Sequence, residues 1–305
     1  MPDTSVLQDM IQPFQIEDLG LRGRLVRLGP AAQAVLGPHG YPAPVSRLMG
    51  EMLALTAVLA GALRFEGVFK MQAQGDGPVS LLVADMTHDG NLRGYARFDA
   101  GAVAALGDPG AAPVPKLLGT GHMAVTVDHG GNSRQHQGVV ALDGARLADC
   151  AHAYFRQSEA VETVITLAAE PGGGEAARAA ALMIERVPAQ QEAVAALTAR
   201  DLEDEWRKAV VLTSSVTAVE MLDAALQAPQ LLYRLYHEDG VRLFQARPVR
   251  QACRCSRDRV AATLASFPPE DLDSMIENEA VNVTCEFCKS EYSFTRGDLD
   301  ALRRA

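Results

Sequence analysis

The sequence Cys253-Arg-Cys255 is followed, after 29 residues, by Cys285-Glu-Phe-Cys288. These two close pairs hold four of the five cysteines in the 305-residue chain. Two pairs at such spacing can supply the four sulfur ligands of a tetrahedral zinc site. Each pair is also short enough to close into a local disulfide ring. The pattern therefore predicts either a metal centre or a redox-active set of thiols near the C-terminus.

Zinc is the metal that this set predicts, because iron–sulfur clusters usually show other cysteine runs. A permanent structural zinc is one interpretation. A redox-active site is a second, because positive charge stabilises thiolates and the first pair is crowded by arginines: Arg247, Arg250, Arg254, Arg257 and Arg259. The same arginines could instead balance the charge of a dianionic zinc–tetrathiolate centre, or simply keep the surface solvated. A structural zinc and a redox-active site therefore both stay open at this point.

The part of the chain that carries these cysteines, residues 246–305, has about 60 residues, a size at which a single hydrophobic core is marginal. Binding of structural zinc supplies on the order of 10–16 kcal/mol in small metal-folded peptides. Oxidation of the four sulfurs would remove the ligands and release the metal. We expect the unit to unfold as a result.

The charge and the hydrophobic pattern of the sequence argue against several classes of function. The chain carries 28 Lys and Arg against 38 Asp and Glu, for a net charge of −10, which argues against a nucleic-acid partner. The first residues lack a basic region followed by an apolar run, so no signal peptide is expected. The longest apolar run, residues 52–63, is shorter than the roughly 20 residues that a membrane-spanning helix needs, so it predicts a core helix. We expect a cytoplasmic protein with no membrane partner, where clustered cysteines are more often metal ligands or redox-active thiols than permanent disulfides.

Residues 1–188 predict an α+β domain with antiparallel sheet and packed helices. A Gly/Ala/Pro loop is predicted for residues 101–115, and the Gly/Ala-rich tract 172–187 leaves the form of the last strand open. Helices are expected at residues 45–63 and 144–158. Strands are expected at residues 14–26, 68–74, 79–86, 92–98, 122–127, 137–142, 161–168 and 182–187.

Residues 189–245 predict a helical linker. Short helices of mixed polarity are expected at residues 190–199, 201–212, 216–226 and 229–237, followed by a short strand at 240–244. Helices of this kind need to pack against another element to be stable. The chain is thus expected to consist of an N-terminal domain, this linker, and a small C-terminal zinc-binding domain from residue 246.

The sequence offers few other candidates for a catalytic or binding site. Cys150 lies on an apolar helical stripe and is expected to be buried and inert, and His129 and His136 are expected at the surface. The sequence contains no phosphate-binding loop, nucleophile elbow or dinucleotide fingerprint, so we expect no enzyme. An alternative is a thiol–disulfide oxidoreductase that uses Cys285 and Cys288, although the usual βαβ setting is missing. A zinc-ribbon-like nucleic-acid adaptor is a third hypothesis, supported only by the arginines.

The sequence resembles the heat shock protein 33 family, the redox-regulated bacterial holdase chaperones. Residues 242–250 (RLFQARPVR), which lead into the first cysteine pair, and residues 292–294 (YSF), which come after the second, match the family pattern. Upstream, residues 74–78 (QGDGP), 93–96 (RGYA) and 154–159 (YFRQSE) match it in the same order. The resemblance covers nearly the whole chain.

This resemblance implies that the reduced, zinc-bound protein is an inactive monomer. Oxidation would form the disulfides Cys253–Cys255 and Cys285–Cys288 and expel one zinc ion. The zinc domain and linker would then unfold, and a homodimer would hold unfolding client proteins without ATP. The sequence does not identify the client-binding surface; the candidates are the apolar sides of the linker helices and the sheet face that they would cover. The apolar residues of these helices are Trp206, Val210, Leu212, Met221, Leu222 and Leu226.

Overall fold

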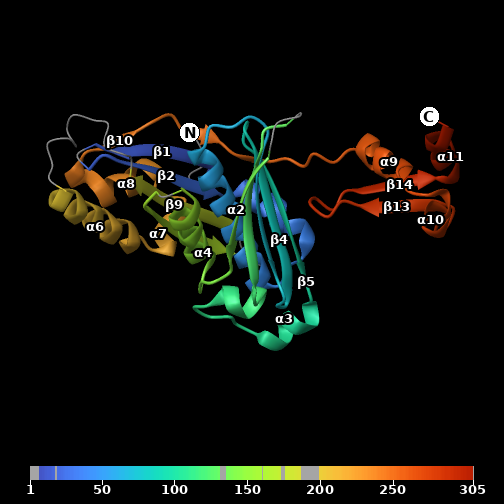
Figure 1. Cartoon of the computed structure of the whole chain (residues 1–305), viewed down its shortest axis with the longest axis horizontal. Helices are drawn as coiled ribbons and strands as arrows, with labels where there is room; N and C mark the ends of the chain where they lie inside the picture. Colours follow the sequence, from blue (N-terminus) through green and yellow to red (C-terminus); the bar gives the residue numbers. More distant parts are fainter. Residues whose placement is uncertain are drawn as a thin grey trace. The chain divides into compact units, whose positions relative to one another are not determined.

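Antiparallel β-sheet and a central helix make up most of the larger of two units in the chain. The computed structural model describes residues 7–17, 19–130, 135–159, 161–172, 176–186 and 199–304. Its contacts divide the chain into the units Met1–Gln251 and Ala252–Ala305. Figure 1 shows the helices and strands of both units.

The larger unit contains two sheets. The first has the strand order β10-β1-β2-β9-β8, with β11 also pairing with β1. Its strands are β1 (Met10–Ile16), β2 (Leu21–Leu28), β8 (Thr163–Glu170), β9 (Arg178–Arg186), β10 (Val241–Leu243) and β11 (Arg247–Pro248). The second has the order β12-β5-β4-β3-β6-β7, in which only β12 runs parallel to its neighbour. Its strands are β3 (Val68–Gly75), β4 (Val79–Thr87), β5 (Asn91–Phe98), β6 (Gly121–Asp128), β7 (His136–Ala141) and β12 (Arg250–Gln251).

Helix α2 (Ala43–Ala62) joins the two sheets, because it packs against β2, β8 and β9 of the first and against β4 and β5 of the second. It is long and apolar enough to cross a membrane by length and composition, but 78% of its most apolar window is buried inside the fold. The expectation of a core helix is therefore confirmed. The other helical segments of this region are α1 (Pro30–Leu36), η1 (Gly37–His39), α3 (Ala100–Leu106), η2 (Val114–Leu118), α4 (Leu147–Tyr154) and η3 (Phe155–Glu159).

A second set of helices covers the opposite face of the first sheet. They are α6 (Ala199–Ser215), α7 (Ala218–Leu222), α8 (Ala228–Tyr236) and the short η4 (His237–Asp239). Trp206 and Tyr236 share a buried cluster with Phe14 of β1, and the Tyr236 and Phe14 rings stack with centroids 5.6 Å apart. Gly23 on β2 leaves room for the Phe14 ring, since a Cβ there would lie 2.1 Å from Phe14 Cζ. The sheet thus supplies the packing partner that these short helices need.

Arg27 of β2 lies beneath these helices and is only 3% exposed. Its guanidinium donates hydrogen bonds to the carbonyl oxygens of Leu226 and Glu220. Burial lowers its pKa to about 10, although the charge of Asp223 opposes this change. A buried cation therefore ties the segment around α7 to the sheet.

Several predicted elements are wrong in detail. The single strand expected at residues 14–26 is two strands, because Gly20 adopts a left-handed backbone with φ of 62° and the chain reverses there. The loop expected at 101–115 contains α3, whose first turn is capped by the Asp99 side chain. The helix expected at 144–158 is α4 followed by the π-helical turn η3. The helix expected at 216–226 ends at Leu222, where Asp223 becomes extended.

The alanine-rich approach to the last strand is itself strand, because β9 begins at Arg178 and pairs with both β2 and β8. Residues 247–251, expected with the cysteines, instead pair with β1 and β5 of the larger unit. The helix expected at residues 190–199 lies almost wholly outside the described residues.

The smaller unit consists of a two-stranded hairpin and three helices. These elements are α9 (Arg257–Ala265), α10 (Pro269–Ser274), β13 (Ala280–Thr284), β14 (Glu291–Thr295) and α11 (Arg296–Arg304). Its buried cluster holds Leu264, Leu272, Val281, Phe294 and Leu299. A cluster of this size gives the unit a small apolar core.

Candidate metal centre

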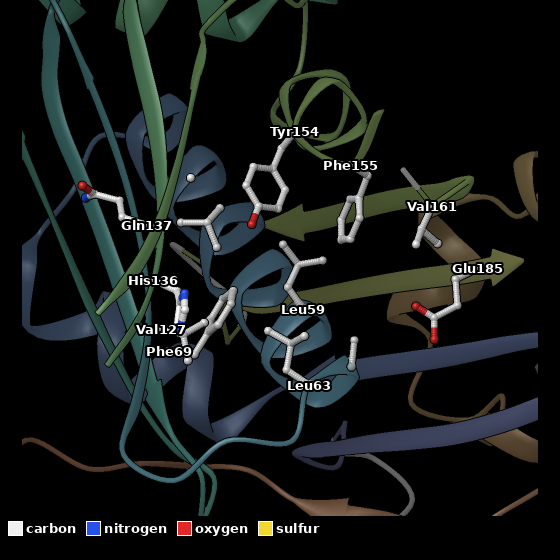
Figure 2. A pocket seen from close by; sticks show the side chains of 13 residues that line it. Leu59, Leu63, Phe69, Val127, His136, Gln137, Tyr154, Phe155, Val161 and Glu185 are labelled. Carbon is white, nitrogen blue, oxygen red and sulfur yellow. The ribbon is translucent and has the colours of Figure 1, made fainter. Parts of the chain in front are cut away.

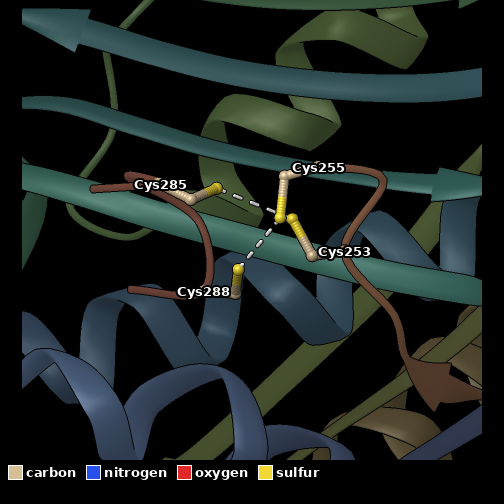
Figure 3. Close-up of side chains that lie close together, drawn as sticks. All are labelled: Cys253, Cys255, Cys285 and Cys288. Carbon is tan, nitrogen blue, oxygen red and sulfur yellow. Dashed lines mark hydrogen bonds between the residues drawn. The ribbon is translucent and has the colours of Figure 1, made fainter. Parts of the chain in front are cut away.

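The four cysteines of the two pairs meet at one point in the smaller unit. Their sulfur atoms all lie within 4.8 Å of one another. Figure 3 shows the four side chains pointing toward a common centre. Cys253 Sγ lies 3.7 Å from Cys285 Sγ, and Cys255 Sγ lies 3.4 Å from Cys288 Sγ. All four are free thiols of intermediate exposure. The arrangement could hold a metal ion between the sulfurs.

Local backbone structure places each pair. Cys253 and Cys255 directly precede α9, whose N-cap Ser256 accepts a hydrogen bond from the Arg259 amide at 3.2 Å. Cys285 and Cys288 lie in the turn between β13 and β14. This turn is closed by bonds from the Lys289 amide to the Cys285 carbonyl (2.8 Å) and from the Cys285 amide to the Ser290 carbonyl (2.9 Å). Hairpin pairing and helix capping thus bring together residues 32 positions apart in the chain.

Two polar side chains contact the sulfurs. The Tyr292 hydroxyl donates to Cys255 Sγ at 3.1 Å, and the Cys288 thiol lies 3.3 Å from Ser290 Oγ. Sequence reasoning missed both as parts of the site. The signals for them were their positions, two and four residues after the last cysteine, and for Tyr292 also its place in the matching 292–294 motif.

The thiols of the cluster differ in acidity. Burial raises the pKa of Cys255 to about 12, despite the hydrogen bond from Tyr292, and burial also raises the pKa of Cys285. Burial acts in the same direction on Cys288, but its hydrogen bonds with Ser290 and the neighbouring thiols outweigh it and lower the pKa to about 7. A cation that binds all four sulfurs would therefore displace protons from them at neutral pH.

The arginines near the first pair have structural partners. Arg247 donates to the His88 carbonyl and Arg250 to Asn91 Oδ1, both within the larger unit. Arg257 lies over the Phe294 ring, 4.2 Å from its centroid. Further hydrogen bonds join Arg257 to the Ser293 carbonyl and Asp298, and Arg259 to the Arg254 carbonyl. These contacts thus fix β-strands, α9 and the segment that leads into it.

The other candidate residues belong to the larger unit. Cys150 is fully buried in the core of the larger unit, where burial raises its pKa to about 11, so the expectation of a buried thiol is confirmed. His129 and His136 are exposed at the ends of β6 and β7. Within the described residues, the four cysteines are the one group of His, Cys, Asp and Glu side chains placed to share a metal ion.

Comparisons with known proteins agree with this architecture. A family model described as "Hsp33 protein" matches residues 9–295. The 33 kDa chaperonin of Caulobacter vibrioides (strain NA1000 / CB15N) is 42% identical over 296 residues, which cover 95% of this chain and 96% of that protein. The 33 kDa chaperonin of Ectopseudomonas mendocina (strain ymp) is 36% identical over 298 residues, with 97% and 95% covered.

The fold is similar to a solved structure as well. The crystal structure of the 33 kDa chaperonin from Thermotoga maritima matches with a TM-score of 0.80 over 97% of both chains, at 17% sequence identity. Both the predicted α+β class and the resemblance seen in the sequence motifs are confirmed. The family match over nearly the whole chain and the relatives above 30% identity show that this chain belongs to the Hsp33 family.

Proposed function

We propose that this protein is a redox-regulated, ATP-independent holdase chaperone of the cytoplasm. In this proposal the reduced, zinc-bound monomer is inactive, and oxidation produces an active homodimer that keeps unfolding proteins from aggregating. The observation that carries the proposal is the cluster of four sulfurs, within 4.8 Å of one another, in a unit with a very small core. Relatives named 33 kDa chaperonin support it.

The cluster fits zinc. Zinc–sulfur bonds of about 2.3 Å in a tetrahedron place the sulfurs about 3.8 Å apart, and two of the sulfur–sulfur separations here are 3.7 and 3.4 Å. Four sulfur donors without oxygen also favour a soft or borderline metal. We propose Cys253, Cys255, Cys285 and Cys288 as its ligands. When bound, zinc would hold four thiolates and link the segment before α9 to the β13–β14 turn.

Oxidation would remove these ligands. One molecule of hydrogen peroxide takes two electrons from a pair of thiols, so that one S–S bond forms and two waters are produced; two pairs need two molecules of peroxide. We propose the pairs Cys253–Cys255 and Cys285–Cys288, which the spacing within each motif allows. The sulfurs also approach one another between the pairs, at 3.7 and 3.4 Å. Mass spectrometry of proteolytic peptides therefore has to decide the pairing, and cross-linked peptides would refute it.

We propose that unfolding spreads from the zinc domain, residues 246–305, to the linker, residues 189–245. Without its metal, the smaller unit has a five-residue core to hold it folded. Release of α6, α7 and α8 from the first sheet would then expose a large apolar face. That face includes Phe14, Ile16, Leu21, Leu25, Leu182 and Ile184. We propose that clients bind there or on the apolar sides of the released helices.

The test compares reduced, zinc-loaded protein with protein treated with peroxide or hypochlorite. Light scattering reports the aggregation of a heat-unfolded client, while a chromogenic chelator reports zinc release. We expect one zinc and four protected thiols before oxidation, then no zinc, two disulfides and suppressed aggregation. Equal protection by the reduced, zinc-loaded protein would refute the redox control.

A second candidate is thiol–disulfide exchange by the Cys285/Cys288 pair. The pKa of Cys288, lowered to about 7, lies within the range of reactive thiols. This activity predicts repeated turnover in the reduction of insulin disulfides by catalytic amounts of protein. Absence of turnover under conditions that remove the zinc would eliminate it.

A further inference from the structure

A cavity of about 450 Å³ lies in the larger unit, where the second sheet, the end of α2 and the α4–η3 segment meet. It is separate from the cysteine cluster, which belongs to the other unit. Figure 2 shows side chains from these elements converging on it. Its apolar walls include Leu59, Leu63, Phe69, Tyr154, Phe155 and Val161.

The size and lining are those of a site for a small molecule. Ligand pockets typically measure about 300–1,000 Å³ and are mainly apolar with a few polar groups. Phe69 is 1% exposed, so the part of the cavity wall that it forms is held in place by the surrounding core. Leu63, in contrast, is 43% exposed and marks a mouth open to solvent. An apolar cavity with such a mouth favours entry of an apolar group over retained water.

One wall is shaped by a close approach between Tyr154 and Gly138 of β7. A Cβ at Gly138 would lie 2.4 Å from Tyr154 Cε2, so the ring packs directly against the strand backbone. The Tyr154 and Phe155 rings then meet edge to face, with centroids 5.6 Å apart and planes at 79°. Two aromatic rings at right angles offer both a face and an edge to a third ring.

The polar groups of the lining select against a strongly charged ligand. Glu185 is already paired with Arg24 at 3.0 Å, and Arg24 also donates to the Gly61 carbonyl, so this carboxylate is neutralised. His136 is exposed at the start of β7, and its ring meets the His129 ring edge to face, with centroids 6.0 Å apart. A ligand would therefore find apolar walls, and at the mouth an imidazole able to donate or accept one hydrogen bond.

We propose that this cavity binds an uncharged aromatic ring system that carries a single hydrogen-bonding group, with the rings against Phe69, Tyr154 and Phe155 and the polar group toward His136. Such a ring can come from a free small molecule or from a tryptophan side chain of an unfolded polypeptide. The inference goes beyond the proposed redox-controlled function and does not depend on it.

The test uses the reduced full-length protein and two probes. The first is 2-naphthol; the second is a flexible Gly/Ser peptide with one tryptophan, paired with the same peptide carrying alanine. Calorimetry measures affinity, and methyl NMR shows whether Leu59, Leu63 and Val161 shift. We expect 2-naphthol to bind with a Kd on the order of 0.1 mM. We expect 2-naphthalenesulfonate, with the same rings and a full charge, to bind at least tenfold more weakly.

Two variants fill the cavity, Ala62→Phe and Val161→Phe, and Val139→Phe adds the same ring at a β7 position that is 53% exposed. We expect each cavity variant to lose at least tenfold in affinity and Val139→Phe to keep it. Tryptophan-peptide binding that the cavity variants abolish would identify side chains as a source, whereas 2-naphthol binding alone would identify free molecules. The proposal is wrong if neither probe binds, or if binding persists unchanged in the folded cavity variants.

Discussion

Replacing Phe294 by alanine tests whether the smaller unit depends on the proposed zinc ion for folding. Phe294 is 2% exposed and belongs to the five-residue core. A buried Phe→Ala change costs about 3–5 kcal/mol, and loss of the Arg257 guanidinium over the ring adds about 0.5–1 kcal/mol. We therefore expect the folded unit to lose about 4 kcal/mol relative to its unfolded state.

The consequence for metal binding depends on the metal-free state. If the metal-free unit is largely unfolded, binding must also fold it, so the whole 4 kcal/mol appears as weaker binding. At 1.36 kcal/mol per factor of ten, zinc affinity should fall by about 10³-fold. If the metal-free unit is stably folded, affinity should hardly change. Competition with a chelator of known zinc affinity measures the difference.

Phe267→Ala is the matched control, because this phenylalanine of the same unit is 39% exposed. It should change zinc affinity by only a few-fold. Circular dichroism with and without chelator would show which metal-free variants are folded. A Phe294→Ala protein that binds zinc within about threefold of the parent would refute the reasoning that the metal holds this unit together.

Three further predictions concern other parts of the chain. The Cys255→Ser variant should bind less than one zinc per chain and lose oxidation-dependent protection of clients. The Cys150→Ser variant, at a buried thiol, should keep its zinc and its protection of clients. Zinc analysis measures the first property and light scattering the second. Trp206→Ala removes a ring that is 9% exposed under Arg186, a change of about 3–5 kcal/mol. The reduced variant should therefore protect clients partly, while Val211→Ala, at a side chain 67% exposed, should not. Burial raises the pKa of Glu51 to about 7, against the attraction of nearby arginines. The folded state consequently holds this proton more tightly than the unfolded state, and stability should fall as pH rises from about 4.5 to 7. Glu51→Gln should remove this dependence and gain up to about 3 kcal/mol above pH 7 but nothing below pH 4.5, as urea unfolding at several pH values would show.

Sequence alone determined what is encoded by short-range chemistry. The spacing within Cys253-Arg-Cys255 and Cys285-Glu-Phe-Cys288 indicated four ligands for one centre, because each pair needs only a tight turn to present two sulfurs. The strands of the meander before residue 98 were also predictable, since their turns and alternation are local. The apolar run in α2 indicated a core helix for the same reason.

Tertiary structure decided what depends on partners far away in the chain. The pairing of β10 with β1 joins residues such as Leu243 and Phe14, and nothing in either segment specifies the other. The same holds for the burial of Arg27 beneath α7 and α8, and for the cavity wall formed by Tyr154 against Gly138. Local sequence sets backbone preference and hydrophobic pattern, whereas long-range pairing depends on the combined free energy of burial for the whole unit. The convergence of the four sulfurs could therefore be predicted from the chain, while the apolar face that the helices cover could be identified only in the folded protein.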